Sequence, residues 1–261
     1  MRTSKIAALL FVLFLIIPRA SYSANADSTF RAWGYLNYTL LFSPDWVFTI
    51  MPGYSYEFSR NDADSAAPHG AQSSVLNELY FGPAYVVQAG EFTLKLPFWY
   101  SFQGYPTAYR DMYHFSHNLD FLPVIQFTHN GLELITRLFL ENKFHTTRVP
   151  EGSNKQGYSL QFRPLVRVNY WLTSSVALTL ADEAYLGLVQ DSNNKSGPEP
   201  GFARKGFSEN RFMAGMEYKF SPFTSIAPQY MLRTLYDPAS SHKLLGIDHC
   251  AFIQFNYIVR L

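Results

Sequence analysis

His114 and Ser116 stand two residues apart in a stretch that alternates apolar and polar residues. In an extended chain this spacing places both side chains on the same face, which Asn118 and Asp120 continue. An imidazole beside a hydroxyl can take its proton and make the serine a nucleophile, as in hydrolases. His-x-Ser patterns also arise often by chance, and the glycine that often follows such a motif is missing here, because His117 comes next.

Charged residues of both signs recur at alternate positions of several later segments. Opposite charges on one shared face would form a hydrogen-bonded network. Such a network is either a stabilising filling or the lining of a restricted passage or cavity for a small polar or charged solute. We predict that it contains Arg137, Glu141, Arg163, Arg167, Glu183, Arg211, Glu217 and Arg233.

Other kinds of site find little support in the sequence. The single cysteine, Cys250, cannot form an intramolecular disulfide, and no Cys/His group has the spacing of a zinc site. His242 and His249 lie close to Cys250 in sequence, but we interpret Cys250 as a small interior residue. No glycine-rich phosphate loop is present, so we expect neither metal nor cofactor. A net charge of +1 gives no reason to expect nucleic acid.

The segments that must position these residues alternate with a period of two, which is typical of β-strands. In the last segment every second residue from Ala251 to Leu261 is apolar, whereas Gln254, Asn256 and Arg260 share the other face. We predict eleven strands, at 30–42, 45–58, 75–88, 91–103, 113–128, 131–146, 157–171, 176–190, 208–220, 224–235 and 246–261.

The connections between these segments alternate between short and long. Turns of a few residues, such as 43–45 and 221–224, take turns with long polar stretches rich in Gly, Pro, Asn, Asp and Ser, such as 59–74 and 191–207. Tight turns at one end and long loops at the other indicate an up-and-down antiparallel meander.

The two faces of the predicted strands differ in charge. When the more apolar face of each segment is taken as outward, the charged residues fall almost entirely on the inward face, and Asp182 alone lies outward. A soluble sandwich also alternates, but so many faces dense in Phe, Tyr, Leu and Ile favour a bilayer, where a closed barrel is the one β solution. Aromatic residues near the short turns fit a membrane interface: Phe42, Trp46, Phe92, Phe127, Tyr170, Trp171, Phe220 and Phe223.

The number of strands conflicts with one general rule. Bacterial barrels normally have an even number of strands with both termini on the periplasmic side. Eleven segments therefore suggest either a missed strand or residues 27–31 threading the interior. We expect twelve strands, with ten as the alternative.

The first 26 residues have the three-part pattern of a secretory signal peptide. Arg2 and Lys5 precede an apolar run from Ile6 to Ile17, and small residues follow around Ala24 and Ala26. The run is shorter than the roughly 20 residues of a spanning helix. We therefore divide the chain into a signal peptide, 1–26, and a single β-barrel domain, 27–261.

From Asp182 onward the sequence resembles an uncharacterised family of bacterial outer-membrane barrels, domain of unknown function 2490. The resemblance rests on Asp182-Glu183-Ala184-Tyr185, on Glu209-Asn210-Arg211-Phe212, and on Gly215, Tyr218 and Tyr230. Trp33 and the arginines at 137, 163 and 167 are also similar to the family. The resemblance implies a barrel in the outer membrane of a Gram-negative bacterium, and it implies no activity.

These observations favour an outer-membrane β-barrel with a narrow or plugged polar lumen, which acts structurally or lets small solutes pass passively. The alternative is an outer-membrane lipid hydrolase that uses His114 and Ser116. The alternation places both residues inward, however, whereas a lipid substrate requires a nucleophile that faces lipid. The expected partners are outer-membrane lipids, the barrel-assembly machinery during insertion, and an unidentified small solute.

Overall fold

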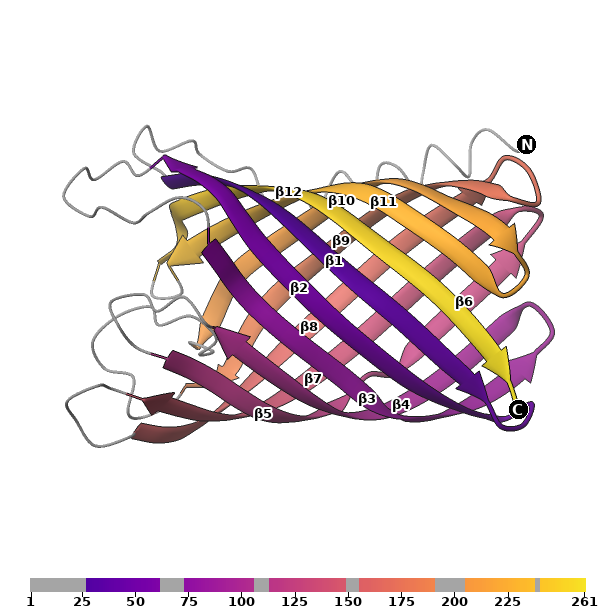
Figure 1. Ribbon diagram of the computed structural model, residues 1–261, viewed down its shortest axis with the longest axis horizontal. Helices are drawn as coiled ribbons and strands as arrows, with labels where there is room; N and C mark the ends of the chain where they lie inside the picture. Colours follow the sequence, from indigo (N-terminus) through magenta and orange to yellow (C-terminus); the bar gives the residue numbers. More distant parts are fainter. Residues whose placement is uncertain (1–26, 62–72, 106–112, 149–154, 191–204, 238–239) are drawn as a thin grey trace.

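The computed structural model describes residues 27–61, 73–105, 113–148, 155–190, 205–237 and 240–261. The regular structure of these residues is β-strand, and their strands close into a single barrel. Among the same residues, no helix is long and apolar enough to cross a membrane. Figure 1 shows the strands tilted around a cylinder, with the short turns and the C-terminus at one end.

Twelve strands make up the wall in the described residues. Their bounds are β1 (Asp27–Leu41), β2 (Trp46–Asn61), β3 (Ser73–Ala89), β4 (Phe92–Tyr105), β5 (Tyr113–Phe121), β6 (Val124–His129), β7 (Leu132–Arg148), β8 (Lys155–Trp171), β9 (Val176–Val189), β10 (Gly206–Ser221), β11 (Thr224–Asp237) and β12 (Ser240–Arg260). Neighbours along the chain pair in antiparallel fashion, as the alternation of short and long connections predicts.

The ring closes through a parallel pair of strands. β1 runs parallel to β12, from Asp27 opposite Gly246 to Leu41 opposite Arg260. β5 and β6 share one place in the wall, because both pair with β4 on one side and β7 on the other. The barrel therefore has eleven positions, which confirms the eleven predicted segments. The twelve expected strands are also found, because β5 and β6 are separate strands at one position, and the parallel closing pair permits an odd number of positions.

The odd number of segments also suggested that residues 27–31 thread the interior, and this suggestion is wrong. Residues 27–31 do not thread the interior but form the first part of β1 in the wall. Arg31 lies opposite Cys250 of β12 and opposite Glu57 of β2.

A proline interrupts the segment predicted as one strand at 113–128. Pro123 has no backbone N–H, so β5 ends at Phe121 and β6 begins at Val124. The wall stays continuous at this point because Leu122 N donates to Pro97 O (3.1 Å) and Leu138 N donates to Pro123 O (2.9 Å). The Leu122 side chain turns into the interior and is fully buried.

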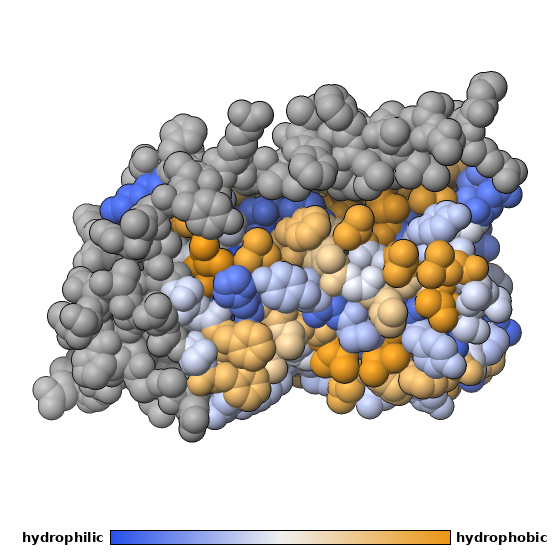
Figure 2. All heavy atoms as spheres, turned by 90° about the horizontal axis from the view of Figure 1, so that it is seen from above, coloured by the Kyte–Doolittle hydropathy of each residue, from blue (hydrophilic) through white to orange (hydrophobic). Residues whose placement is uncertain are grey.

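The outer face of the wall is rich in exposed apolar and aromatic side chains. Figure 2 shows hydrophobic and weakly polar residues covering most of the described wall on that side. Near the short turns, six of the eight aromatic residues assigned to this level are strongly exposed: Phe42, Trp46, Phe92, Tyr170, Phe220 and Phe223. This arrangement is the reverse of that in a soluble protein, in which such side chains would be buried.

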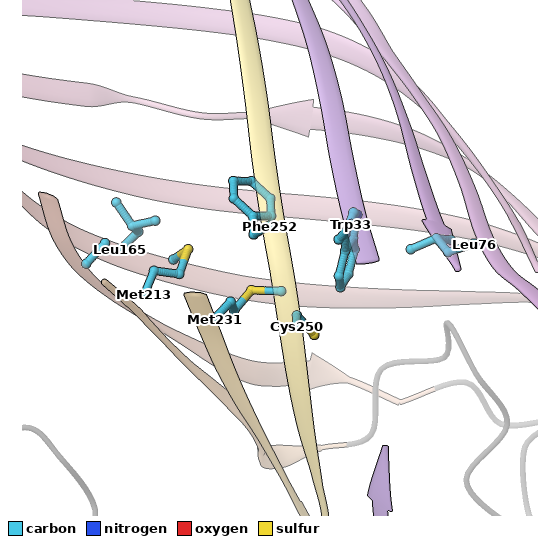
Figure 3. Close-up of a cluster of buried hydrophobic side chains, with 8 residues drawn as sticks. Trp33, Leu76, Leu165, Met213, Met231, Cys250 and Phe252 are labelled. Carbon is cyan, nitrogen blue, oxygen red and sulfur yellow. The ribbon is translucent and has the colours of Figure 1, made fainter. Parts of the chain in front are cut away.

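An apolar cluster occupies part of the interior. Figure 3 shows these side chains pointing inward from strands far apart in sequence: Trp33, Leu76, Leu165, Met213, Met231, Cys250 and Phe252. Cys250 is fully buried among them, as its interpretation as a small interior residue implies. The interior is thus a packed core at this level, which is the usual state of a barrel with few strands.

One interior glycine accommodates an aromatic ring from the neighbouring strand. Gly53 of β2 lies opposite Tyr35 of β1, and a Cβ at position 53 would lie 2.3 Å from the Tyr35 ring. The tyrosine hydroxyl, in turn, donates a hydrogen bond to Glu78. The glycine is therefore required for the position of the ring.

We expect Gly53→Ala to lower the free energy of unfolding by about 1–3 kcal/mol, because the ring must move away from Glu78. Urea titration of the barrel in lipid vesicles measures this loss. The matched control is Gly34→Ala, where the nearest atom to the new Cβ is Ile253 Cγ2 at an ordinary 3.4 Å. Equal stability losses for the two variants would contradict the packing described here.

Candidate functional site: a sealed layer inside the barrel

Seven inward side chains from seven strands form a closed circuit of contacts inside the barrel, which we call the transverse layer. Its members come from β1, β3, β4, β7, β8, β9 and β10, and they are brought to one level by the registers of these strands. They are Trp33, Glu78, Gln103, Glu141, Arg163, Tyr185 and Arg211.

Hydrogen bonds connect one half of the transverse layer. Arg163 Nη1 donates to Glu141 Oε2 (3.4 Å), and Gln103 Nε2 donates to Glu141 Oε1 (3.0 Å). The same Gln103 nitrogen lies 3.1 Å from Glu78 Oε1, and Trp33 Nε1 donates to Glu78 Oε2 (3.3 Å). The bond from Gln103 to Glu141 passes over β5, so it crosses part of the interior rather than following the wall.

Stacked guanidinium groups and aromatic rings complete the other half. Arg163 Cζ lies 4.4 Å from the centre of the Tyr185 ring, and Arg211 Cζ lies 4.5 Å from the same centre. Arg211 Cζ also lies 4.7 Å from the Trp33 ring. β10 and β1 are separated by β11 and β12, so this last contact spans the interior. Arginine stacked on an aromatic face is favourable, particularly where water is excluded.

Six of the seven side chains of the transverse layer are buried, and the side chain of Arg211 is 13% exposed. Trp33 is 4% exposed, Gln103 3%, Glu141 0% and Tyr185 5%. Arg163 also interacts electrostatically with Tyr35 and Tyr80, which belong to β1 and β3. A water-filled pore at this level would expose these groups, whereas the structure buries them.

A chain of ion pairs lies next to the transverse layer, toward the ends of the strands that are away from the short turns. Arg31 pairs with Glu57 (2.9 Å) and with Asp248 (3.0 Å). Arg233 continues the chain by pairing with Asp248 (2.7 Å) and with Glu209 (2.7 Å). Buried charges are tolerated when each has a partner of opposite sign, as here.

The structure brings six of the eight predicted network residues into contact with opposite charges. Glu183 accepts from Arg137 and from Arg163, and Arg163 also reaches Glu141. Arg211 and Arg233 both pair with Glu209. The remaining two predicted members, Arg167 and Glu217, make no ion pair within 4.0 Å among the described residues, although both lie on inward faces.

The structure describes one side chain of the predicted catalytic pair. Ser116 is fully buried in the interior, and its hydroxyl has no hydrogen-bond partner among the described residues. The side chain of His114 lies outside the described residues; its backbone lies opposite Tyr105 and Thr147. The imidazole nearest in register to Ser116 belongs to His145, whose Nε2 is 2.6 Å from Ser159 Oγ.

Several members of the interior network escaped the sequence analysis. Glu209 and Trp33 were noted only for the family resemblance, while Arg31 and Asp248 were not assigned to the inward face. Alternation alone would have found Glu209, which shares a face with Arg211, and Asp248, which shares a face with Gln254. The contact between Trp33 and Arg211 has no sequence signal, because two strands separate these residues in the ring.

Asp182, the one charged residue expected on the outer face, has a neutral partner there. Asn210 Nδ2 donates to Asp182 Oδ1 (2.8 Å) and to the backbone oxygen of Glu183. Glu183 and Arg211, which directly follow these two residues, point into the barrel. The two motifs of the family resemblance therefore meet across the β9–β10 pair on both faces.

The single cysteine of the chain provides a direct test of the closed interior. We expect Cys250 in the folded barrel to resist a water-soluble maleimide and to react fully after heating in denaturant, because the folded thiol is buried. Mass spectrometry of the labelled protein measures the fraction of Cys250 that has reacted in the folded and in the denatured state. Rapid labelling of the folded barrel would mean that water reaches the interior at this level.

A metal site in the interior would require several ligating side chains close together. In the described part of the chain, no group of three or more His, Cys, Asp or Glu is placed to hold a metal ion. Many of the buried polar groups bond to one another, and satisfied networks of this kind hold a unique packing.

Comparisons with known proteins agree with the resemblance noted in the sequence. The model of a family described as protein of unknown function (DUF2490) matches residues 18–243, which include the barrel from β1 to the start of β12. No curated protein matches the sequence.

Proposed function

The chain belongs to the family of proteins of unknown function DUF2490, and we propose that it is a sealed β-barrel of a Gram-negative outer membrane. In this proposal residues 1–26 direct export, and the barrel-assembly machinery inserts the folded domain. The barrel serves as a structural element of the envelope, and solutes pass only when the interior opens.

The outer wall supports the membrane position. Exposed aromatic and aliphatic side chains such as Leu36, Phe98, Leu138 and Tyr218 recur around the ring, while the interior carries the charges. Water would make such a wall prone to aggregate, whereas hydrocarbon is its favourable solvent. The closed ring leaves no open sheet edge, which a bilayer requires.

The transverse layer is the single observation that carries the barrier function. Its hydrogen bonds and stacked rings connect strands on different sides of the interior, and its members are nearly without solvent contact. Between a narrow lumen and a plugged one, this packing supports the plugged form.

Fractionation of a Gram-negative host that expresses the full chain tests the proposal. We expect the protein in the outer-membrane fraction, shortened at its N-terminus, and migrating faster on gels without heating than after boiling. Recovery from the periplasm without detergent would refute the membrane position. The control is the protein variant Leu10→Arg, in which the apolar run is disrupted. This variant should remain in the cytoplasm of the host.

A further inference from the structure

One arginine and one glutamate of the interior differ from all their neighbours. The buried or half-buried arginines Arg31, Arg137, Arg163, Arg211 and Arg233 each pair with a carboxylate. Arg167, by contrast, has no hydrogen bond or ion pair with a described residue, and its Nε atom is buried without a partner. Among the interior carboxylates of the described strands, Glu217 alone accepts no hydrogen bond.

These two residues flank the same strand on the short-turn side of the transverse layer. Arg167 of β8 lies opposite Ala181 of β9, and Glu217 of β10 lies opposite Ala177 of the same strand. Both side chains point inward, because they share the faces of the buried Asn169 and Met213. Both remain half-buried and thus keep some contact with solvent.

The distance between the two charges is set by the strand that separates them. β8 and β10 lie on either side of β9, so their backbones are about 10 Å apart, and the register offsets Arg167 from Glu217 by four residues, roughly 13 Å, along the strand direction. The alanines of β9 allow long side chains to extend over them. The two side chains form no ion pair within 4.0 Å, so a cation and an anion lie diagonally across β9 without a direct contact.

Most other charges near this place have direct partners, and Lys95 of β4, which makes no ion pair within 4.0 Å among the described residues, lies near Glu133. Arg137 is bonded to Glu183, and both oxygens of Glu133 accept hydrogen bonds, from Gln126 and Asn169. The ammonium of Lys219 stacks on the Trp171 ring at 3.6 Å. Arg167 and Glu217 are therefore the opposite charges on β8 and β10 that have no direct partner at this end of the interior.

We propose that Arg167 and Glu217 together bind a small zwitterionic solute, of the amino-acid class. Its carboxylate would accept hydrogen bonds from the planar guanidinium of Arg167, which suits a carboxylate well. Its ammonium group would donate to Glu217. A simple anion or cation would match one charge and leave the other without a partner, whereas a zwitterion satisfies both and leaves the net charge unchanged.

This site deepens the proposed function, because it names a solute class that the sealed barrel would hold at its short-turn end. Binding does not require that the solute crosses the transverse layer. The site and the barrier can therefore fail independently in experiments.

Isothermal titration of the purified, folded full-length barrel in detergent with glycine and with 4-aminobutyrate tests the site. We expect saturable binding of at least one of these zwitterions. Acetate and methylammonium, which carry a single charge, should bind at least about tenfold more weakly, as expected for the loss of one charge-assisted hydrogen bond.

Variants of the two charges identify the place of binding. Arg167→Gln and Glu217→Gln should each weaken zwitterion binding by about tenfold or more. The exchange variant with Arg167→Glu and Glu217→Arg should recover binding, because both charges are present again. Lys95→Gln is the matched control: it removes an interior cation of β4, on another part of the wall, and should leave binding unchanged.

Heat-modifiable migration of every variant verifies that the barrel is folded. Absence of saturable zwitterion binding to the folded wild type would overturn the inference and leave the sealed barrel intact. Equal binding of acetate would overturn it in favour of a simple anion site at Arg167. Binding that survives both single variants would place the solute elsewhere.

Discussion

Replacing Glu183 by leucine is expected to lower the free energy of unfolding by about 3–5 kcal/mol, the usual cost of removing one partner of a buried ion pair. Glu183 is 3% exposed and neutralises Arg137 and Arg163 together. Without it, Arg137 loses the one ion pair found for it in the described residues. Urea unfolding of the barrel in lipid vesicles, followed by tryptophan fluorescence, measures the loss.

The neighbouring residue provides a matched control on the opposite face of the same strand. Like Glu183→Leu, Asp182→Leu replaces a carboxylate by leucine, but it does so on the outer wall. There the hydrocarbon of the proposed membrane position favours the leucine side chain. We expect its stability to stay within about 1 kcal/mol of the wild type, since the gain offsets the lost bond to Asn210. A larger loss for Asp182→Leu than for Glu183→Leu would reverse the inside and outside assigned to the wall.

Removing Trp33 and Arg211 together is expected to open the transverse layer to solutes. The double variant Trp33→Ala, Arg211→Ala takes away the contact that spans β11 and β12. Glu209 keeps Arg233, Glu183 keeps Arg163, and Glu78 keeps Gln103, so no buried carboxylate loses its last partner. The barrel should fold, and vesicles that contain it should swell in an isotonic solution of a small sugar.

A second double variant separates loss of the layer from loss of bulk. Phe30 and Phe58 form a ring contact at 5.9 Å on the outer wall and are both exposed. Phe30→Ala, Phe58→Ala therefore removes two large side chains without touching the interior, and these vesicles should not swell. Swelling with the outer-wall variant, or none with a folded Trp33, Arg211 variant, would contradict the barrier assigned to the layer.

The fold followed from the sequence because each strand carries its own signal. Period-two alternation, as in Ala251 to Leu261, fixes which side chains share a face, and the turns fix where each strand ends. Pro123 divides one predicted strand because a proline cannot donate to the ladder, but Pro52 and Pro83 lie within continuous strands, so the division could not be predicted from the proline alone. The parallel closure of β1 on β12 could not be predicted from the sequence either, because closure depends on the curvature of the whole ring.

The interior site was predicted in part, for a related reason. Alternation places Arg137, Glu141 and Arg163 inside, but it gives neither the depth of each residue nor its partner across the ring. The depth follows from the stagger between strands, which brings Gln103 of β4 to Glu141 of β7 and Arg211 of β10 to Trp33 of β1. Contacts across an interior therefore require the barrel geometry as well as the pattern of each strand.

Electrical recording from the wild-type barrel in a planar lipid bilayer tests the sealed interior most directly. Insertion is verified first by resistance of the reconstituted protein to unfolding without heat. We then expect the current to stay at the level of the bare bilayer under moderate voltage, because the transverse layer leaves no path for hydrated ions. A stable open level in single, correctly inserted wild-type barrels would contradict the sealed state on which this account depends.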